Sequence, residues 1–145
     1  MKLTVEEDEK LTETEITIKC KKKDEKIKKL IEMIGTYYIN VNGKKDGENY
    51  RLSLDDIYYF EAVENRVFAY VKKDVYEVNY KIVELEEVLK NTSFIRISRT
   101  VILNILKIER VSTLVNGRIL ANLDNGEKII ITRLYAKEFK RKLQG

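Results

Sequence analysis

Two pairs of adjacent carboxylates are the residues whose type and spacing could support acid-base chemistry or hold a divalent cation. They are Asp55-Asp56 and Glu86-Glu87. Adjacent acids at the start of a turn or on one face of a helix are usually solvated, and no glycine-containing calcium loop surrounds either pair. The carboxylates therefore predict neither catalysis nor a metal site.

Other catalytic side chains are scarce. The chain has no histidine, which removes the commonest general base, the commonest metal ligand and every histidine-activated nucleophile. Its single cysteine, Cys20, can form neither an internal disulfide nor a zinc cluster, and we expect it to be a small buried apolar side chain. The segment Gly43-Lys44-Lys45-Asp46-Gly47 has the wrong spacing for a phosphate-binding loop and predicts a hairpin connection. The sequence disfavours an enzyme, and we expect no cofactor and no bound metal.

The charge of the chain is unevenly distributed. Residues 95–145 carry 11 lysines and arginines against four acidic residues, whereas residues 1–94 carry 17 against 20. A basic C-terminal third on an otherwise acidic protein is typical of a surface that faces phosphates. A solvated surface with uneven charge is the simpler alternative, and charge alone does not decide between the two.

The length of 145 residues suits one compact domain with a short accessory segment. Residues 1–34 form that segment. Alternating apolar and polar residues predict short strands at 2–5 and 15–20, and a helix is expected from Asp24, which can cap it, to Ile34, before Gly35. The helix has one apolar stripe, which must pack on the main domain or on a second copy of the chain. The stripe consists of Ile27, Leu30, Ile31 and Ile34.

Residues 35–145 predict a mainly β domain. Valine, isoleucine, tyrosine and phenylalanine recur with a period of two, as half-buried strands require. The dipeptides Asn116-Gly117 and Asn125-Gly126 indicate two-residue turns with positive φ at both positions, which makes residues 111–132 a three-stranded meander. Strands are expected at 37–41, 57–62, 67–72, 75–80, 94–98, 108–114, 118–123 and 128–131.

Two helices are expected within this domain. Residues 82–90 predict an amphipathic helix that covers the core. Residues 134–143 predict a second helix, with Thr132 as its candidate N-cap. One face of the second helix is apolar and the other is basic. The apolar face holds Tyr135, Phe139 and Leu143, and the basic face holds Lys137, Lys140, Arg141 and Lys142. No pair of helices joined by a short turn is predicted, so any DNA reading must come from loops or strand ends.

Several segments follow one another in an order and spacing found in a known family. The longest runs from Phe94 to Asn104 with the sequence FIRISRTVILN and is followed by Ile108. The others are residues 56–61, 85–89, 125–127 and 129–135. Over about residues 36–144 the chain resembles the LytTR family of bacterial DNA-binding domains. The resemblance implies a compact arrangement of antiparallel sheets with one or two short helices.

The resemblance also implies which residues contact DNA, because the family places loops from one side of the domain into successive major grooves. Carried over residue by residue, the base-reading positions are Asn65 or Arg66, Arg99 and Arg133. Arginine matches the two acceptors of guanine, and asparagine can pair with adenine. The loop after Glu61 varies in length among relatives, so both of its residues are kept. Phosphate contacts are expected from Arg96, Ser98, Thr100, Thr132, Tyr135, Lys137 and Lys140.

Two of the residues in the resembling segment have an alternative interpretation. Arg96 can also be an ordinary exposed strand residue. Asn104 belongs to the family's signature, but its apolar neighbours favour a structural role in a turn held by buried hydrogen bonds.

The 34 residues before the domain are too few for a receiver domain, so the chain resembles the stand-alone LytTR regulators. That resemblance implies a regulator that binds direct repeats in double-stranded DNA, with a small membrane protein as a possible regulator. No apolar run approaches the ~20 residues of a membrane helix and the N-terminus has no apolar signal core, so we expect a cytoplasmic protein. The N-terminal helix is the expected contact of a homodimer on DNA. A protein-interaction adaptor with a basic surface is the alternative, and it predicts weak DNA binding that depends only on salt.

Overall fold

The computed structural model describes residues 1–144, which form ten strands and three helices. In chain order these are α1 (Glu25–Tyr38), β1 (Asn40–Lys45), β2 (Glu48–Ser53), β3 (Ile57–Val63), β4 (Arg66–Val71), β5 (Val75–Val78), α2 (Ile82–Val88), β6 (Phe94–Arg96), β7 (Val101–Asn104), β8 (Ile108–Thr113), β9 (Ile119–Leu123), β10 (Lys128–Ile131) and α3 (Arg133–Gln144). Three short 3-10 turns, η1 (Leu54–Asp56), η2 (Ile105–Lys107) and η3 (Val115–Gly117), lie between strands. The domain is mainly β, as predicted.

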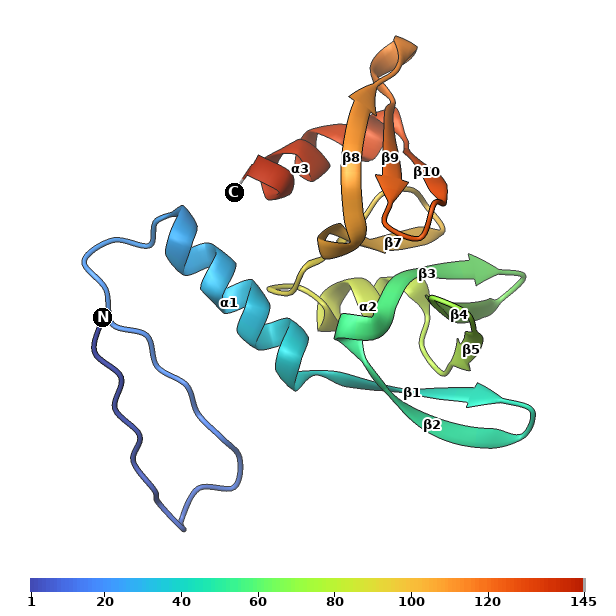
Figure 1. Ribbon diagram of the computed structural model, residues 1–145. Coiled ribbons are helices and arrows are strands. Elements are labelled where there is room, and N and C mark those ends of the chain that lie inside the picture. The colour runs from blue at the N-terminus through green and yellow to red at the C-terminus, as the bar shows by residue number, and fades with distance from the viewer. Residues whose placement is uncertain (145) are drawn as a thin grey trace.

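The strands form two antiparallel sheets. The larger sheet has the order β2-β1-β5-β4-β3-β7-β6, and the smaller sheet has the order β10-β9-β8. Figure 1 shows the smaller sheet and α3 on one side of β7, with strands β1 to β5 and helix α2 on the other. The smaller sheet is the three-stranded meander that the sequence predicts.

Strand β7 separates two hydrophobic cores. Ile102 packs with Phe60 in the core under α2, whereas Val101 and Leu103 pack with Phe139 of α3 in the second core. A strand that is buried on both faces is a continuous apolar run, without the alternation that marks a half-buried strand. For this reason the sequence predicts no strand at residues 101–104.

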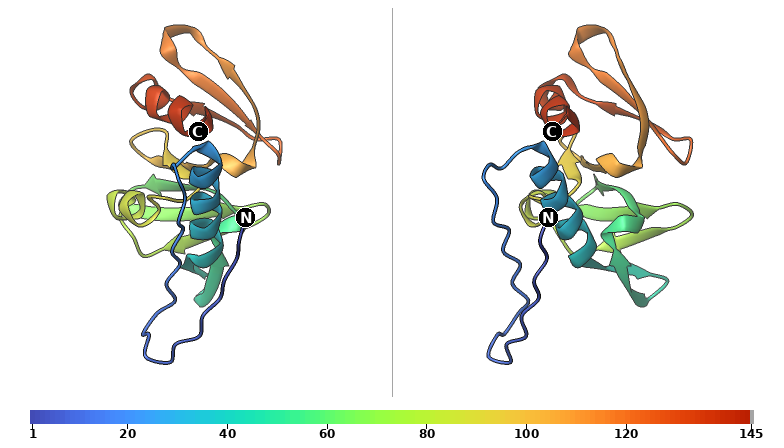
Figure 2. Two further views of the ribbon diagram at one scale, coloured as in Figure 1. Left: turned by 90° about the vertical axis from the view of Figure 1, so that its left-hand side faces the viewer. Right: turned by 60° about the vertical axis from the view of Figure 1, so that its left-hand side comes forward.

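The expected N-terminal strands are absent from the structure. Residues 2–5 and 15–20 have no strand partner, and they belong to a long loop that extends away from the domain in all three views (Figures 1 and 2). Cys20 lies in this loop with an exposed side chain, so the prediction of a buried cysteine is wrong. Alternation stabilises a strand only when a neighbouring strand and an apolar surface are available, and this loop has neither.

Helix α1 begins as predicted and ends later than predicted. The Asp24 carboxylate accepts the Ile27 N–H at 3.0 Å, which caps the first turn. The helix continues through Gly35 to Tyr38, so residues 37 and 38 are not strand. A Cβ at position 35 would lie 2.7 Å from the Asn91 carbonyl oxygen. Gly35 therefore permits close packing of α1 against the domain and does not terminate the helix. The boundary expected between residues 34 and 35 falls inside α1.

The turns follow the sequence only in part. Asn116 and Gly117 both have positive φ, at 62° and 76°, as predicted, whereas in the Asn125-Gly126 pair only Gly126 does, at 90°. Strand β2 was not predicted, but its hairpin with β1 lies where the glycine-containing connection was expected. The Thr132 hydroxyl donates to the Ile97 carbonyl at 3.2 Å, whereas a helix cap would accept an N–H of the first turn of α3.

No helix of residues 1–144 is long and apolar enough to cross a membrane.

Candidate nucleic-acid interface

Three loops meet at one end of the domain. They are the β3–β4 turn, residues 97–100 between β6 and β7, and the junction of β10 with α3. The Ala62 N–H donates to the Thr100 carbonyl at 2.8 Å, which joins the first loop to the second. The Thr132 N–H donates to the Ile97 carbonyl at 3.0 Å, which joins the second loop to the third. The structure therefore brings together the three segments that the sequence analysis predicted to contact bases.

The loop of residues 97–100 is held from outside along its whole length, because each of its four carbonyls accepts a hydrogen bond. Ile97 and Thr100 at the two ends are bound by Thr132 and Ala62. The carbonyls of Ser98 and Arg99 in the middle are bound by the Arg96 guanidinium. This network fixes the backbone and leaves the Arg99 and Thr100 side chains exposed.

Ser98 faces inward. Its hydroxyl oxygen accepts the backbone N–H groups of Thr100 at 3.3 Å and of Val101 at 3.1 Å. The hydroxyl therefore stabilises the turn that carries Arg99. Of the neutral donors expected to contact phosphates, Ser98 and Thr132 both bond to the backbone of the protein, whereas the exposed Thr100 hydroxyl lies 3.5 Å from that of Ser98.

The β3–β4 connection is a two-residue hairpin turn. Glu64 and Asn65 have φ values of 48° and 62°, the left-handed conformation that this tight turn requires at both positions. Asn65 is thus at the tip of the turn with an exposed side chain. Arg66 is the first residue of β4, and its guanidinium lies 3.9 Å from the Glu77 carboxylate. Both candidates for the first base-reading position are exposed at this end of the domain.

Arg133 is the first residue of α3, and its side chain is exposed. A Cβ at Gly117 would lie 2.8 Å from the Arg133 Cγ, so the stem of this arginine rests against the tip of the β8–β9 hairpin. The Asn116-Gly117 dipeptide predicted the turn but could not show that Arg133 would be its neighbour. The support of Arg133 by this hairpin was therefore missed by the sequence analysis.

The charged residues expected to contact phosphates differ in exposure. Lys137 and Lys140 are exposed on α3. The Arg96 side chain is only 14% exposed, and its guanidinium lies 5.9 Å from the centre of the partly buried Tyr135 ring. Asn104 is fully buried and hydrogen-bonded to four neighbours, so its predicted structural role is confirmed.

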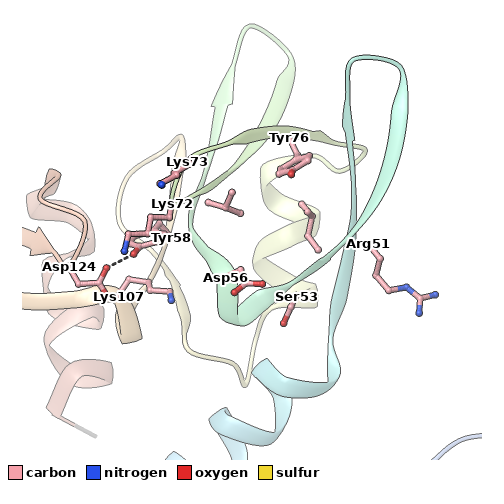
Figure 3. Close-up of a pocket in the computed structure, with 11 residues that line it drawn as sticks. Arg51, Ser53, Asp56, Tyr58, Lys72, Lys73, Tyr76, Lys107 and Asp124 are labelled. Carbon is pink, nitrogen blue, oxygen red and sulfur yellow. Dashed lines mark hydrogen bonds between the residues drawn. The ribbon is translucent and has the colours of Figure 1, made fainter.

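A groove of about 790 Å³ lies at the opposite end of β3 from these loops. Figure 3 shows Lys72 and Lys107 close to Tyr58 and Asp124, while Arg51 points away from them. The Tyr58 hydroxyl donates to Asp124, and this hydrogen bond together with burial raises the pKa of Tyr58 to about 12. The bond connects the larger sheet to the loop after β9 of the smaller sheet.

No group of three or more acidic or cysteine side chains within residues 1–144 is placed to hold a metal ion.

Comparison with known proteins identifies the family. The sequence model of the protein family described as the LytTr DNA-binding domain matches residues 47–144 of this chain. The chain belongs to the LytTR family. Its fold is also that of the LytTr DNA-binding domain of a protein from Bacillus cereus described as a methyl-accepting/DNA response regulator. The two structures match with a TM-score of 0.68 and 24% identity, over 73% of this chain and 97% of the other.

Two curated relatives of this chain differ in how much of their own length it covers. The sensory transduction protein LytT of Enterococcus faecalis is 34% identical over 94 residues, which cover 65% of this chain and 39% of LytT. The chain thus spans about two fifths of the length of that relative. The uncharacterized HTH-type transcriptional regulator SAS2254 of Staphylococcus aureus is 27% identical over 145 residues, 99% of this chain and 98% of that protein. In this chain, strands separate each of the three helices within residues 1–144 from the next.

Proposed function

We propose that this LytTR protein is a sequence-specific transcriptional regulator that inserts its three joined loops into neighbouring major grooves of duplex DNA. The observation that carries the proposal is the convergence of these loops at one end of the domain, each with an exposed arginine or asparagine. Base edges in the major groove present a distinct pattern of donors and acceptors for each base pair, so side chains of these two types can distinguish them.

Arg99, Arg133 and the Asn65/Arg66 pair are the proposed base readers. Arg99 and Arg133 each present two parallel N–H groups that match the O6 and N7 acceptors of guanine. Asn65 at the turn tip suits adenine, whereas Arg66 would first have to leave the Glu77 carboxylate 3.9 Å away. One good pair of this kind contributes about 1–3 kcal/mol of discrimination between bases.

Lys137, Lys140 and Thr100 are the proposed phosphate contacts with the most accessible side chains. The two lysines lie on α3, which begins at Arg133. Contacts to phosphate set the register of the protein on DNA and increase affinity for all sequences. Replacing Lys140 should therefore weaken binding to all sequences about equally and make it less sensitive to salt.

Helix α1 is the proposed contact between two copies on DNA. Its residues Leu30, Met33 and Tyr37 have helical spacing and are 37%, 61% and 73% exposed. Pairing two domains that bind direct repeats raises the effective concentration of the second domain without a new base contact. Cytoplasmic action, a possible small membrane-protein regulator and an accessory role for residues 1–34 remain predictions from the sequence.

Selection of bound duplexes from a random pool tests the proposal. The wild-type chain, Arg99→Ala and Arg133→Ala would be compared, with Arg51→Ala at the opposite end of the domain as the matched control. We expect a repeated motif that loses preference at a different base pair in each of the two loop variants and is unchanged in the control. If no motif is enriched and binding depends only on salt, the protein is an adaptor and the base-reading assignments are wrong.

A further inference from the structure

We propose that Arg96 is a positioning residue that holds the base-reading loop of residues 97–100 in shape and does not contact phosphate itself. The inference rests on the proposed function, because it concerns how Arg99 is presented to DNA. It differs from the role expected for Arg96 from the sequence.

Each of the three nitrogens of the Arg96 guanidinium donates a hydrogen bond within the protein. Its Nε donates to the Ser98 carbonyl at 3.1 Å, and its Nη2 donates to the Arg99 carbonyl. Its Nη1 donates to the Glu86 carboxylate of α2 at 3.2 Å. Each nitrogen of the guanidinium therefore has a protein partner, and only 14% of the side chain is exposed. Three of its five N–H donors are used in this way, and the other two belong to a side chain with little exposed surface, so a phosphate oxygen has little access to the guanidinium.

Two anchors outside the loop fix the position of the guanidinium. One is Glu86 on α2, and the other is the ring of Tyr135 on α3, 5.9 Å from the guanidinium carbon. An arginine next to an aromatic face gains a cation–π attraction, and its hydrogen bond to a carboxylate is stronger than one between neutral groups. Arg96 thereby connects helices from both cores to the middle of the loop.

Arg96 holds the two carbonyls in the middle of the loop, while the Ser98 hydroxyl accepts the N–H groups of Thr100 and Val101. The ends, at Ile97 and Thr100, are bound through Thr132 and Ala62. Loss of the guanidinium frees the carbonyls of Ser98 and Arg99 while both ends stay in place. The Arg99 side chain would then sample several directions, and binding would have to restrict them again. The consequence is a loss of discrimination at the base pair that Arg99 reads.

An arginine is required at this position because three acceptors in different directions need a planar group with several N–H donors. Lysine keeps the positive charge but offers a compact ammonium on a flexible stem. The variant Arg96→Lys therefore separates geometry from charge. A positioning role predicts that lysine fails, whereas a phosphate contact predicts that lysine largely substitutes.

The experiment measures binding to a panel of duplexes that vary only at the base pair read by Arg99, at three salt concentrations. For Arg96→Lys we expect discrimination at that pair to fall about 10-fold, comparable to the loss of one base contact. For Arg96→Gln we expect the slope of log affinity against log salt to stay at the wild-type value. A slope smaller by about 0.9, with discrimination intact, would show that Arg96 neutralises a phosphate and would overturn the inference.

A second variant changes a different quantity under each of the two roles. Glu86→Gln weakens the anchor of Arg96, so a positioning role predicts reduced discrimination at the same base pair. If Arg96 contacted phosphate, removing the neighbouring negative charge would strengthen binding to every duplex and leave discrimination unchanged. Thermal melting of each variant, with Arg51→Lys as the matched control, separates a change in the loop from loss of the fold.

Arg99→Ala distinguishes failure of this inference from failure of the proposed function. If Arg99→Ala leaves the base preference unchanged, Arg99 is not a reader and the proposed function loses that assignment. If Arg99→Ala removes the preference while Arg96→Lys and Glu86→Gln keep it, Arg99 stays a reader and only the positioning role of Arg96 is wrong.

Discussion

Replacement of Asn104 by alanine should destabilise the domain strongly, because this buried side chain bonds to four other residues. Its Nδ2 donates to the Ile57 carbonyl at 2.9 Å and lies 3.5 Å from the Leu54 carbonyl. Its Oδ1 accepts the Ser93 hydroxyl at 2.7 Å and the Leu106 N–H at 3.1 Å. Alanine can make none of these bonds.

The size of the effect follows from the groups that lose their partner. Three of the four bonds are well formed, and each leaves behind a buried or partly buried polar group that costs about 1–3 kcal/mol when it is unsatisfied. We expect a decrease of about 4 kcal/mol in the free energy of unfolding, allowing for partial relaxation. Since small domains are stable by about 5–15 kcal/mol, this loss is a large part of the total.

Urea denaturation followed by circular dichroism measures the change, with Asn42→Ala as the matched control because Asn42 is exposed on β1. Asn104→Asp is a second informative variant, since it keeps the shape but places a carboxylate oxygen against the Ile57 carbonyl. We expect it to be at least as destabilising as alanine. A loss below about 1 kcal/mol for Asn104→Ala, similar to a surface change, would refute the reasoning from buried hydrogen bonds.

Three further predictions concern the turn under Arg133, the Tyr58–Asp124 bond and the N-terminal loop. Gly117→Ala and Gly126→Ala should each lose about 1–2 kcal/mol of stability because φ is positive at both sites, but only Gly117→Ala, whose Cβ would meet Arg133, should also weaken DNA binding in a gel-shift assay. Equal binding by the two variants would contradict support of Arg133 by the hairpin. Because the pKa of Tyr58 is raised from 10.0 to about 12, stability should fall as pH rises from 10 towards 12, and Asp124→Asn should lower this pKa in an ultraviolet titration. An unchanged titration curve would exclude the Tyr58–Asp124 bond as its cause. Deletion of residues 1–23, which make few contacts, should change the unfolding free energy by less than about 0.5 kcal/mol, and a larger loss would show that the loop packs on the domain.

The sequence predicted those elements whose pattern is local. Period-two segments such as β3, the Asp24 cap of α1 and the Asn116-Gly117 turn depend on neighbouring residues, and each formed as expected. Strand β7 was not predicted because burial on both faces removes the alternation. The alternating residues 15–20 formed no strand because strand pairing depends on a partner, which a local pattern does not specify.

The sequence could predict which residues belong to the candidate site. It could not predict how their side chains contact one another. The resemblance named Arg99, Arg133 and the Asn65/Arg66 pair, and the structure places them at one end of the domain. The contacts of Arg96 with Glu86 and Tyr135 join residues from α2, β6 and α3. Such contacts arise from the packing of distant segments, so no spacing along the chain could have shown them.

The hydrogen bonds that hold residues 97–100 have a consequence for how such proteins diverge. All four carbonyls are bound by groups outside positions 98–100 or by Arg96, and none by the side chains of Arg99 or Thr100. The hydrogen bonds that hold the loop therefore do not depend on which side chain occupies position 99. If Arg99 reads a base as proposed, a gene copy can acquire a new operator preference by substitution at position 99 with little loss of folding stability. Evolution can thus change what the domain recognises while the framework that presents the residue is inherited intact.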